Sequence, residues 1–123
     1  MRIKTGGYGG FTIVEIMIVV ALIGLLLAIA IPNFLKSRDA SQLTVVYNNL
    51  RTIETAKDQW ALENKKGTGV SIGLQDLSDY IRGGTIKPVV REVYESNLIG
   101  SPAYATHTVK LGTYFPSDPI YAP

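Results

Sequence analysis

The residues of this 123-residue chain that could perform acid–base or nucleophilic chemistry form no catalytic motif by their spacing. Ser71, His107 and Asp118 are the residue types of a nucleophilic triad, but no local signature accompanies any of them. His107 is the one histidine and there is no cysteine, which excludes thiolate nucleophiles, disulfides and metal sites built from several histidines. We therefore expect no catalytic residue, no metal ligand set and no cofactor.

The charges of the chain do not indicate a charged ligand either. Asp76 and Asp79 are spaced to share a helix face and could bind a hard cation, but a solvated acidic face is the favoured interpretation. The net charge of +2 matches the two basic residues Arg2 and Lys4, and from Gln42 onward eight basic residues balance eight acidic ones. No basic face is visible, so we expect no nucleic acid partner.

Glu15 is the acidic residue in the most unusual surroundings. Every residue from Ile16 to Ile31 is apolar except Gly24, and no charge occurs between Glu15 and Lys36. A helix of about 20 such residues crosses a bilayer. A carboxylate inside it costs roughly 2.5–3.5 kcal/mol near the centre and less near the interface. The Glu15 side chain therefore either extends to the lipid interface or pairs with an opposite charge on a partner.

Three interpretations of the apolar run remain open at this point. It can be a plain membrane anchor, or a secretory signal peptide with a small-x-small cleavage site at residues 28–30. The third is an interpretation in which the Glu15 carboxylate has a function of its own. All three exclude a freely soluble cytosolic enzyme.

The junction Gly10-Phe11-Thr12-Ile13-Val14-Glu15, followed by an apolar run that closes with Ile31-Pro32, resembles the leader junction of type IV prepilins and type II secretion pseudopilins. The resemblance implies that a prepilin peptidase cleaves after Gly10 and that a methyl group is then added to the amine of Phe11. It also implies that Glu15 accepts this amine from a neighbouring subunit. The signal-peptide interpretation, by contrast, leaves Glu15 without a purpose.

The implied protein is a structural filament subunit and not an enzyme. It would be a single-pass protein of the inner membrane, in contact with lipid and an assembly platform. It would then join identical or related pilin subunits in a periplasmic or cell-surface filament. A type IV pilus-like filament is the main hypothesis and the pseudopilus of a type II secretion system the alternative. A membrane-anchored or secreted enzyme with a conventional signal is the alternative from another class.

The elements that must position these residues follow from the hydrophobic pattern. We expect a cleaved leader over residues 1–10, a membrane and assembly half of a long helix over 11–35, its amphipathic soluble half over 36–66, and a small head over 67–123. Gly24 and Pro32 weaken the helix, and a gentle kink is expected in an isolated subunit. In assembled filaments, the resemblance implies that the stretch between these two residues unwinds.

The head is expected to pack on an apolar stripe of the soluble half of the helix. The stripe consists of residues at helical spacing: Leu43, Val46, Tyr47, Leu50, Ile53, Trp60 and Ala61. A short helix is predicted over 74–81 and strands over 89–94, 105–111 and 113–115, with an irregular proline-containing tail. The predicted fold class is α+β and pilin-like: one long N-terminal helix packed against a small antiparallel sheet.

Overall fold

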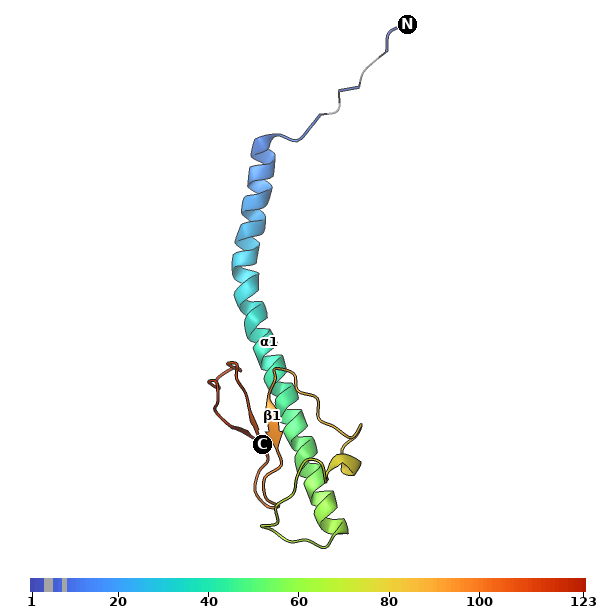
Figure 1. Cartoon of the computed structure of the whole chain (residues 1–123). Coiled ribbons are helices and arrows are strands. Elements are labelled where there is room, and N and C mark those ends of the chain that lie inside the picture. The colour runs from blue at the N-terminus through green and yellow to red at the C-terminus, as the bar shows by residue number, and fades with distance from the viewer. Residues whose placement is uncertain (4–5, 8) are drawn as a thin grey trace. The chain divides into compact units, whose positions relative to one another are not determined.

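The computed structural model describes residues 1–3, 6–7 and 9–123, which form two compact units over residues 1–35 and 36–123. Helix α1 (Ile13–Glu63) contributes to both units (Figure 1). The described residues of the expected leader have neither helix nor strand and are exposed, and its Lys4, Thr5 and Tyr8 lie outside the described residues.

Helix α1 passes through both of the residues expected to weaken it. Gly24 and Pro32 are helical, and so are the residues on either side of them. Proline removes one backbone hydrogen bond, which the leucine-, alanine- and isoleucine-rich turns around it can tolerate within a long helix. Unwinding between these positions therefore remains a prediction for the assembled state.

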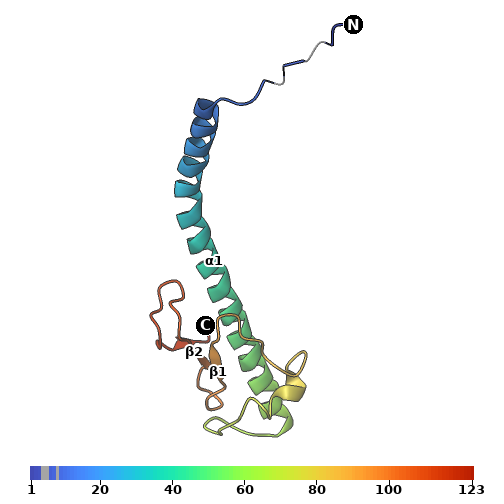
Figure 2. The ribbon, with the colours of Figure 1, turned by 45° about the horizontal axis from the view of Figure 1, so that its top comes forward.

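The second unit contains the sheet and one short helical turn. Its elements are η1 (Ser78–Tyr80), β1 (Val93–Glu95), β2 (Tyr104–Thr106) and β3 (Ile120–Tyr121). The strands form an antiparallel sheet in the order β1-β2-β3, with Tyr94 opposite Ala105 and Ala105 opposite Ile120. The sheet lies along the C-terminal half of α1 (Figure 2). One long helix and a small antiparallel sheet make this an α+β fold.

The core of the second unit lies between α1 and the segments that follow it. Buried residues of the helix, Val46, Leu50, Ile53 and Ala56, meet buried residues of the sheet and loops, among them Leu77, Ala105, Leu111 and Ile120. Leu43 and Trp60, both in the expected stripe, pack against this cluster but are only partly buried.

The polar pair Glu54 and Lys57 interrupts the apolar stripe and has a structural function. The Lys57 side chain is 1% exposed, and its Nζ donates to Glu54 Oε1 at 3.0 Å and to the Ser101 carbonyl at 2.6 Å. The Ala103 amide donates to the same Glu54 oxygen. Helix α1 therefore holds the chain just before β2 through polar contacts as well as apolar ones.

The predicted short helix over 74–81 is wrong in type and extent. Only the single 3₁₀ turn Ser78–Tyr80 is helical, preceded by hydrogen-bonded turns. The amides of residues 76–78 and 80 bond three residues back, so no α-helical ladder develops before Gly83 and Gly84 end the segment. The spacing of Leu77 and Ile81 does bury both side chains.

The predicted strands are displaced. Residues 89–92 are not a strand because the Glu92 carboxylate accepts the amides of Val89 and Val90, and Arg91 has a left-handed φ of 61°. The strand expected over 105–111 ends at Thr106. The strand expected over 113–115 is instead a tight turn that pairs Leu111 with Tyr114, and the tail supplies β3.

Candidate functional site

The first turn of α1 carries a pair of reciprocal hydrogen bonds. The Thr12 amide donates to Glu15 Oε2 at 3.3 Å, and the Glu15 amide donates to Thr12 Oγ1 at 3.2 Å. Because α1 begins at Ile13, Thr12 is the N-cap and Glu15 the third helical residue. This arrangement is a capping box, in which two side chains satisfy two amides that the helix itself leaves unbonded.

The capping function of Glu15 was missed in the sequence analysis. Its signal was available, because a threonine followed three residues later by a glutamate, ahead of an apolar run, predicts a helix start. The Glu15 carboxylate is exposed. Of its two oxygens, only Oε2 accepts a hydrogen bond within the described residues. Oε1 therefore remains available to a further donor.

The surroundings of the capping box are apolar and open. Phe11 is 84% exposed, and the side chains from Ile13 to Leu35 are all exposed in the structure. A shallow hollow of about 520 Å³ is lined by Phe11, Glu15 and three apolar side chains of the first two turns. Within the described residues, α1 is the one helix long and apolar enough to cross a membrane, with a mean hydropathy of 3.0 over its most apolar window. So much exposed apolar surface requires lipid or protein around it.

Gly24 lies in the middle of this exposed apolar surface. A Cβ added there would meet nothing within 4 Å, so the isolated chain gives no steric reason for glycine. The structure brings Glu15 next to Phe11 and Thr12, and Gly24 and Pro32 lie farther along the same helix.

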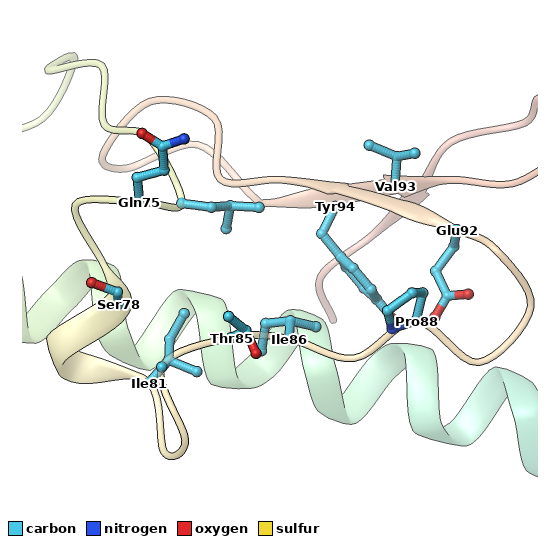
Figure 3. A pocket seen from close by; sticks show the side chains of 11 residues that line it. Gln75, Ser78, Ile81, Thr85, Ile86, Pro88, Glu92, Val93 and Tyr94 are labelled. Atoms are coloured by element: carbon cyan, nitrogen blue, oxygen red, sulfur yellow. Dashed lines mark hydrogen bonds between the residues drawn. The ribbon is translucent and has the colours of Figure 1, made fainter.

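The second unit contains an apolar pocket of about 570 Å³ between β1 and the segment 74–88 (Figure 3). Its ionisable groups are Glu92 and Tyr94. Burial alone would raise the pKa of Glu92, but hydrogen bonds from the Tyr94 hydroxyl and from the amides of Val89 and Val90 lower this pKa overall. Burial, and then the bond to Glu92, raise the pKa of Tyr94. Both groups are engaged in holding the loop before β1, so neither is poised for proton transfer.

Within the described residues, no hydrogen bond joins the side chains of Ser71, His107 and Asp118. Ser71 pairs with Leu98 through the backbone, and the Asp118 carboxylate accepts the Phe115 amide. His107 is 2% exposed, with Nδ1 2.6 Å from the Val109 carbonyl oxygen. Asp76 accepts the Gly73 amide. Over residues 1–3, 6–7 and 9–123, no group of three histidine, cysteine or acidic side chains could hold a metal ion.

Comparison with known proteins places the capping box inside a recognised motif. A family described as "Prokaryotic N-terminal methylation motif" matches residues 7–31, which include Gly10, Phe11 and Glu15. The N-terminal segment of this chain is of the prepilin type. Relatives of this chain include type IV pilins and type II secretion core proteins. The layout of the chain, a long N-terminal helix with a small antiparallel sheet, is pilin-like.

Three relatives show how far the similarity extends. The type IV major pilin protein PilA of Myxococcus xanthus is 46% identical over 57 residues, which are 46% of this chain and 26% of that protein. The type II secretion system core protein G of Klebsiella michiganensis is 32% identical over 55% of this chain and 48% of its own length. Fimbrial protein Q of Moraxella bovis is 36% identical over 79% of this chain and 62% of its own length.

The chain therefore spans about a quarter to a half of the first two relatives. No solved structure matches the chain.

Proposed function

We propose that this prepilin-type chain is the structural subunit of a type IV pilus-like filament, with the pseudopilus of a type II secretion system as the alternative. The observation that carries the proposal is the methylation motif over residues 7–31 together with the relatives named as pilins, fimbrial proteins and secretion core proteins. A filament bundle would cover the apolar surface that α1 exposes, which an isolated chain in water cannot do.

Before assembly, the apolar half of α1 would anchor the subunit in the inner membrane. A prepilin peptidase would cleave between Gly10 and Phe11. In the structure the described residues next to this bond are exposed and have no helix or strand, so they are accessible to a protease. Cleavage leaves Phe11 with an α-amino group, whose ordinary pKa of about 8 makes it largely an ammonium at neutral pH. A methyl group on this nitrogen retains the positive charge.

The new ammonium and the capping box explain how one subunit could align the next. An ammonium and a carboxylate both need a partner where lipid replaces water. Glu15 already accepts its own Thr12 amide through Oε2, and Oε1 is open to a donor. The Phe11 ammonium of an incoming subunit would neutralise this carboxylate. The pairing would fix the position of each helix along an otherwise apolar bundle.

This proposal is tested by comparing Glu15→Leu with Thr12→Val. The first variant removes both the cap and the carboxylate, whereas the second removes the Thr12 hydroxyl from the cap and keeps the carboxylate. Losing an N-cap costs about 0.5–2 kcal/mol, which a long helix in a membrane tolerates. Leaving a buried ammonium without its partner costs about 3–5 kcal/mol at each subunit addition.

We therefore expect Glu15→Leu to give processed, membrane-resident protein without filaments, and Thr12→Val to give filaments. Electron microscopy of sheared filaments and immunoblots of membrane fractions measure both outcomes. Equal filament yields in Glu15→Leu and the wild type would exclude the charge-pairing step. Loss of filaments in both variants would assign the effect of Glu15 to helix capping.

A further inference from the structure

Three basic residues from distant parts of the chain converge on one surface pocket of the second unit. Arg38 of α1, Arg91 of the loop before β1 and Lys110 of the loop after β2 line a pocket of about 350 Å³, together with a single acid, Asp39. These residues are far apart in the sequence, in which the charges balance beyond Gln42 and predict no basic face.

Among the described residues, none of the three cations is paired with an acid, and the Lys110 Nζ lies 5.4 Å from the centroid of the Phe115 ring. All three are exposed, and over the described part of the chain the one salt bridge within 4.0 Å joins Glu54 and Lys57. The Glu92 carboxylate, next to Arg91 in sequence, is buried and accepts the Val89 and Val90 amides and the Tyr94 hydroxyl, so it forms no ion pair with Arg91. The pocket therefore has a lining charge of +2, from three basic residues and one acid.

The loop that presents Arg91 is held in an unusual conformation. Arg91 has a φ of 61°, which non-glycine residues rarely adopt. The Glu92 carboxylate fixes this loop through the two valine amides. Such conformations persist where the surrounding structure imposes them, and they are frequent at binding sites.

Two apolar side chains flank the cations. Val89 is 43% exposed and Val109 is 52% exposed, and both line the same pocket. Exposed valines beside arginine and lysine suit the boundary between lipid headgroups and acyl chains, where apolar and cationic groups are both satisfied.

The position of Arg38 in the chain limits how far the pocket can lie from the lipid headgroups of a membrane. Arg38 follows Leu35, the last residue of the expected membrane half of α1, by three residues, and three residues reach about 11 Å at most. The headgroup layer on each side of a bilayer is about 5–8 Å thick. Arg38 must therefore lie within or next to that layer whenever the apolar segment spans a membrane, and the pocket that it lines lies there with it.

We propose that the pocket of Arg38, Arg91 and Lys110 binds the phosphate headgroup of an anionic phospholipid while the subunit resides in the membrane. The inference rests on the membrane-inserted stage of the proposed function and does not depend on filament assembly. The headgroup supplies the anion that the three cations lack, and the valines contact the glycerol region. Lipid bound in this way holds the second unit against the bilayer surface until assembly removes the subunit.

The test uses the full chain in detergent micelles, with phosphatidylglycerol or phosphatidylcholine added and bound lipid counted by native mass spectrometry. The variant Arg38→Gln/Arg91→Gln/Lys110→Gln removes the pocket charges. Its matched control, Arg51→Gln/Lys66→Gln/Arg82→Gln, removes three exposed basic residues elsewhere and changes the net charge equally. Each basic residue near an anionic surface strengthens binding about fivefold.

We expect the wild type to retain phosphatidylglycerol at least tenfold more tightly than phosphatidylcholine. The pocket variant should lose between tenfold and a hundredfold in phosphatidylglycerol affinity, and the control less than threefold. The single variant Arg38→Gln, on an exposed helix face, should lose about fivefold in phosphatidylglycerol affinity. It replaces the triple variant in the test if the triple variant unfolds.

Equal losses in the pocket variant and the control would overturn the proposal, because net charge alone would then explain binding. Inorganic phosphate that competes at the same concentration as the lipid would identify a free phosphate site instead. Dimers that form in lipid-free micelles and disappear in the pocket variant would assign the pocket to an acidic surface of a second copy. Carbonate extraction of cell membranes checks insertion separately, so a failure of the membrane-inserted stage is distinguishable from a failure of this pocket.

Discussion

Substitution of Lys57 by methionine tests how the sheet is held to the long helix. Methionine keeps an unbranched apolar stem but removes the ammonium, which donates to Glu54 at 3.0 Å and to the Ser101 carbonyl at 2.6 Å. The Ser101 carbonyl then loses a charged donor, while Glu54 keeps the hydrogen bond from the Ala103 amide.

The size of the effect follows from the burial of the two partners. A hydrogen bond to a charged group contributes about 1.5–3 kcal/mol. The Lys57 side chain is 1% exposed, so its bond to Ser101 counts nearly in full, whereas Glu54 is 31% exposed and water replaces part of its bond. We therefore expect Lys57→Met to lower the free energy of unfolding by about 2–3 kcal/mol. In a domain of this size that corresponds to a fall in Tm of about 10–20 °C.

The assay is urea and thermal unfolding of the fragment 36–123, followed by circular dichroism. Lys66→Met is the matched control, because Lys66 is exposed after the end of α1 and should change stability by less than about 0.5 kcal/mol. The double variant Glu54→Gln/Lys57→Met should lose less than the sum of the two single losses, since the pair is coupled. If Lys57→Met and Lys66→Met unfold at the same urea concentration, the polar contacts do not hold β2 to the helix.

Two further predictions concern the core and the loop before β1. Leu50→Ala should lower the free energy of unfolding by about 3–5 kcal/mol, because Leu50 is 0% exposed. The control Leu62→Ala, at a side chain that is 79% exposed, should have little effect. Urea unfolding compares the two variants, and similar midpoints would refute the packing described here. The pKa of Glu92 is lower in the folded chain, so the unfolded chain binds the proton more tightly. The ionised Glu92 carboxylate therefore contributes to stability above the ordinary carboxyl pKa of about 4.3, and this contribution is lost as the pH falls through the lower folded pKa. Glu92→Gln should therefore destabilise at pH 7 by about 1.5–3 kcal/mol and flatten the acid limb of the stability profile, and an unchanged acid limb would show that Glu92 does not control it.

The long helix could be predicted from the sequence because its signals are local. An uninterrupted apolar run followed by a stripe at helical spacing predicts one helix, and the structure has α1 from Ile13 to Glu63. The junction at Gly10 could likewise be recognised from adjacent residues. The capping box could also be predicted from local sequence, because it depends only on the spacing between Thr12 and Glu15.

The strands were harder to predict because their positions depend on residues elsewhere. Val89 and Val90 have high strand propensity, but the Glu92 carboxylate takes their amides before a neighbouring strand can. Ile120 lies in a proline-containing tail, yet it joins the sheet because Ala105 offers it a partner. The basic pocket was equally invisible, since Arg38 and Lys110 meet only after folding.

The proposed function is tested most directly by the intact mass and N-terminal residue of the protein purified from cell membranes and from sheared filaments. The account predicts a chain that begins at Phe11, lacks residues 1–10 and carries one added methyl group on its α-nitrogen. The same species should occur in both fractions. A chain that begins at Met1 in filaments, or a mature chain in which cleavage after Ala30 has left Ile31 at the N-terminus, would contradict processing as a prepilin.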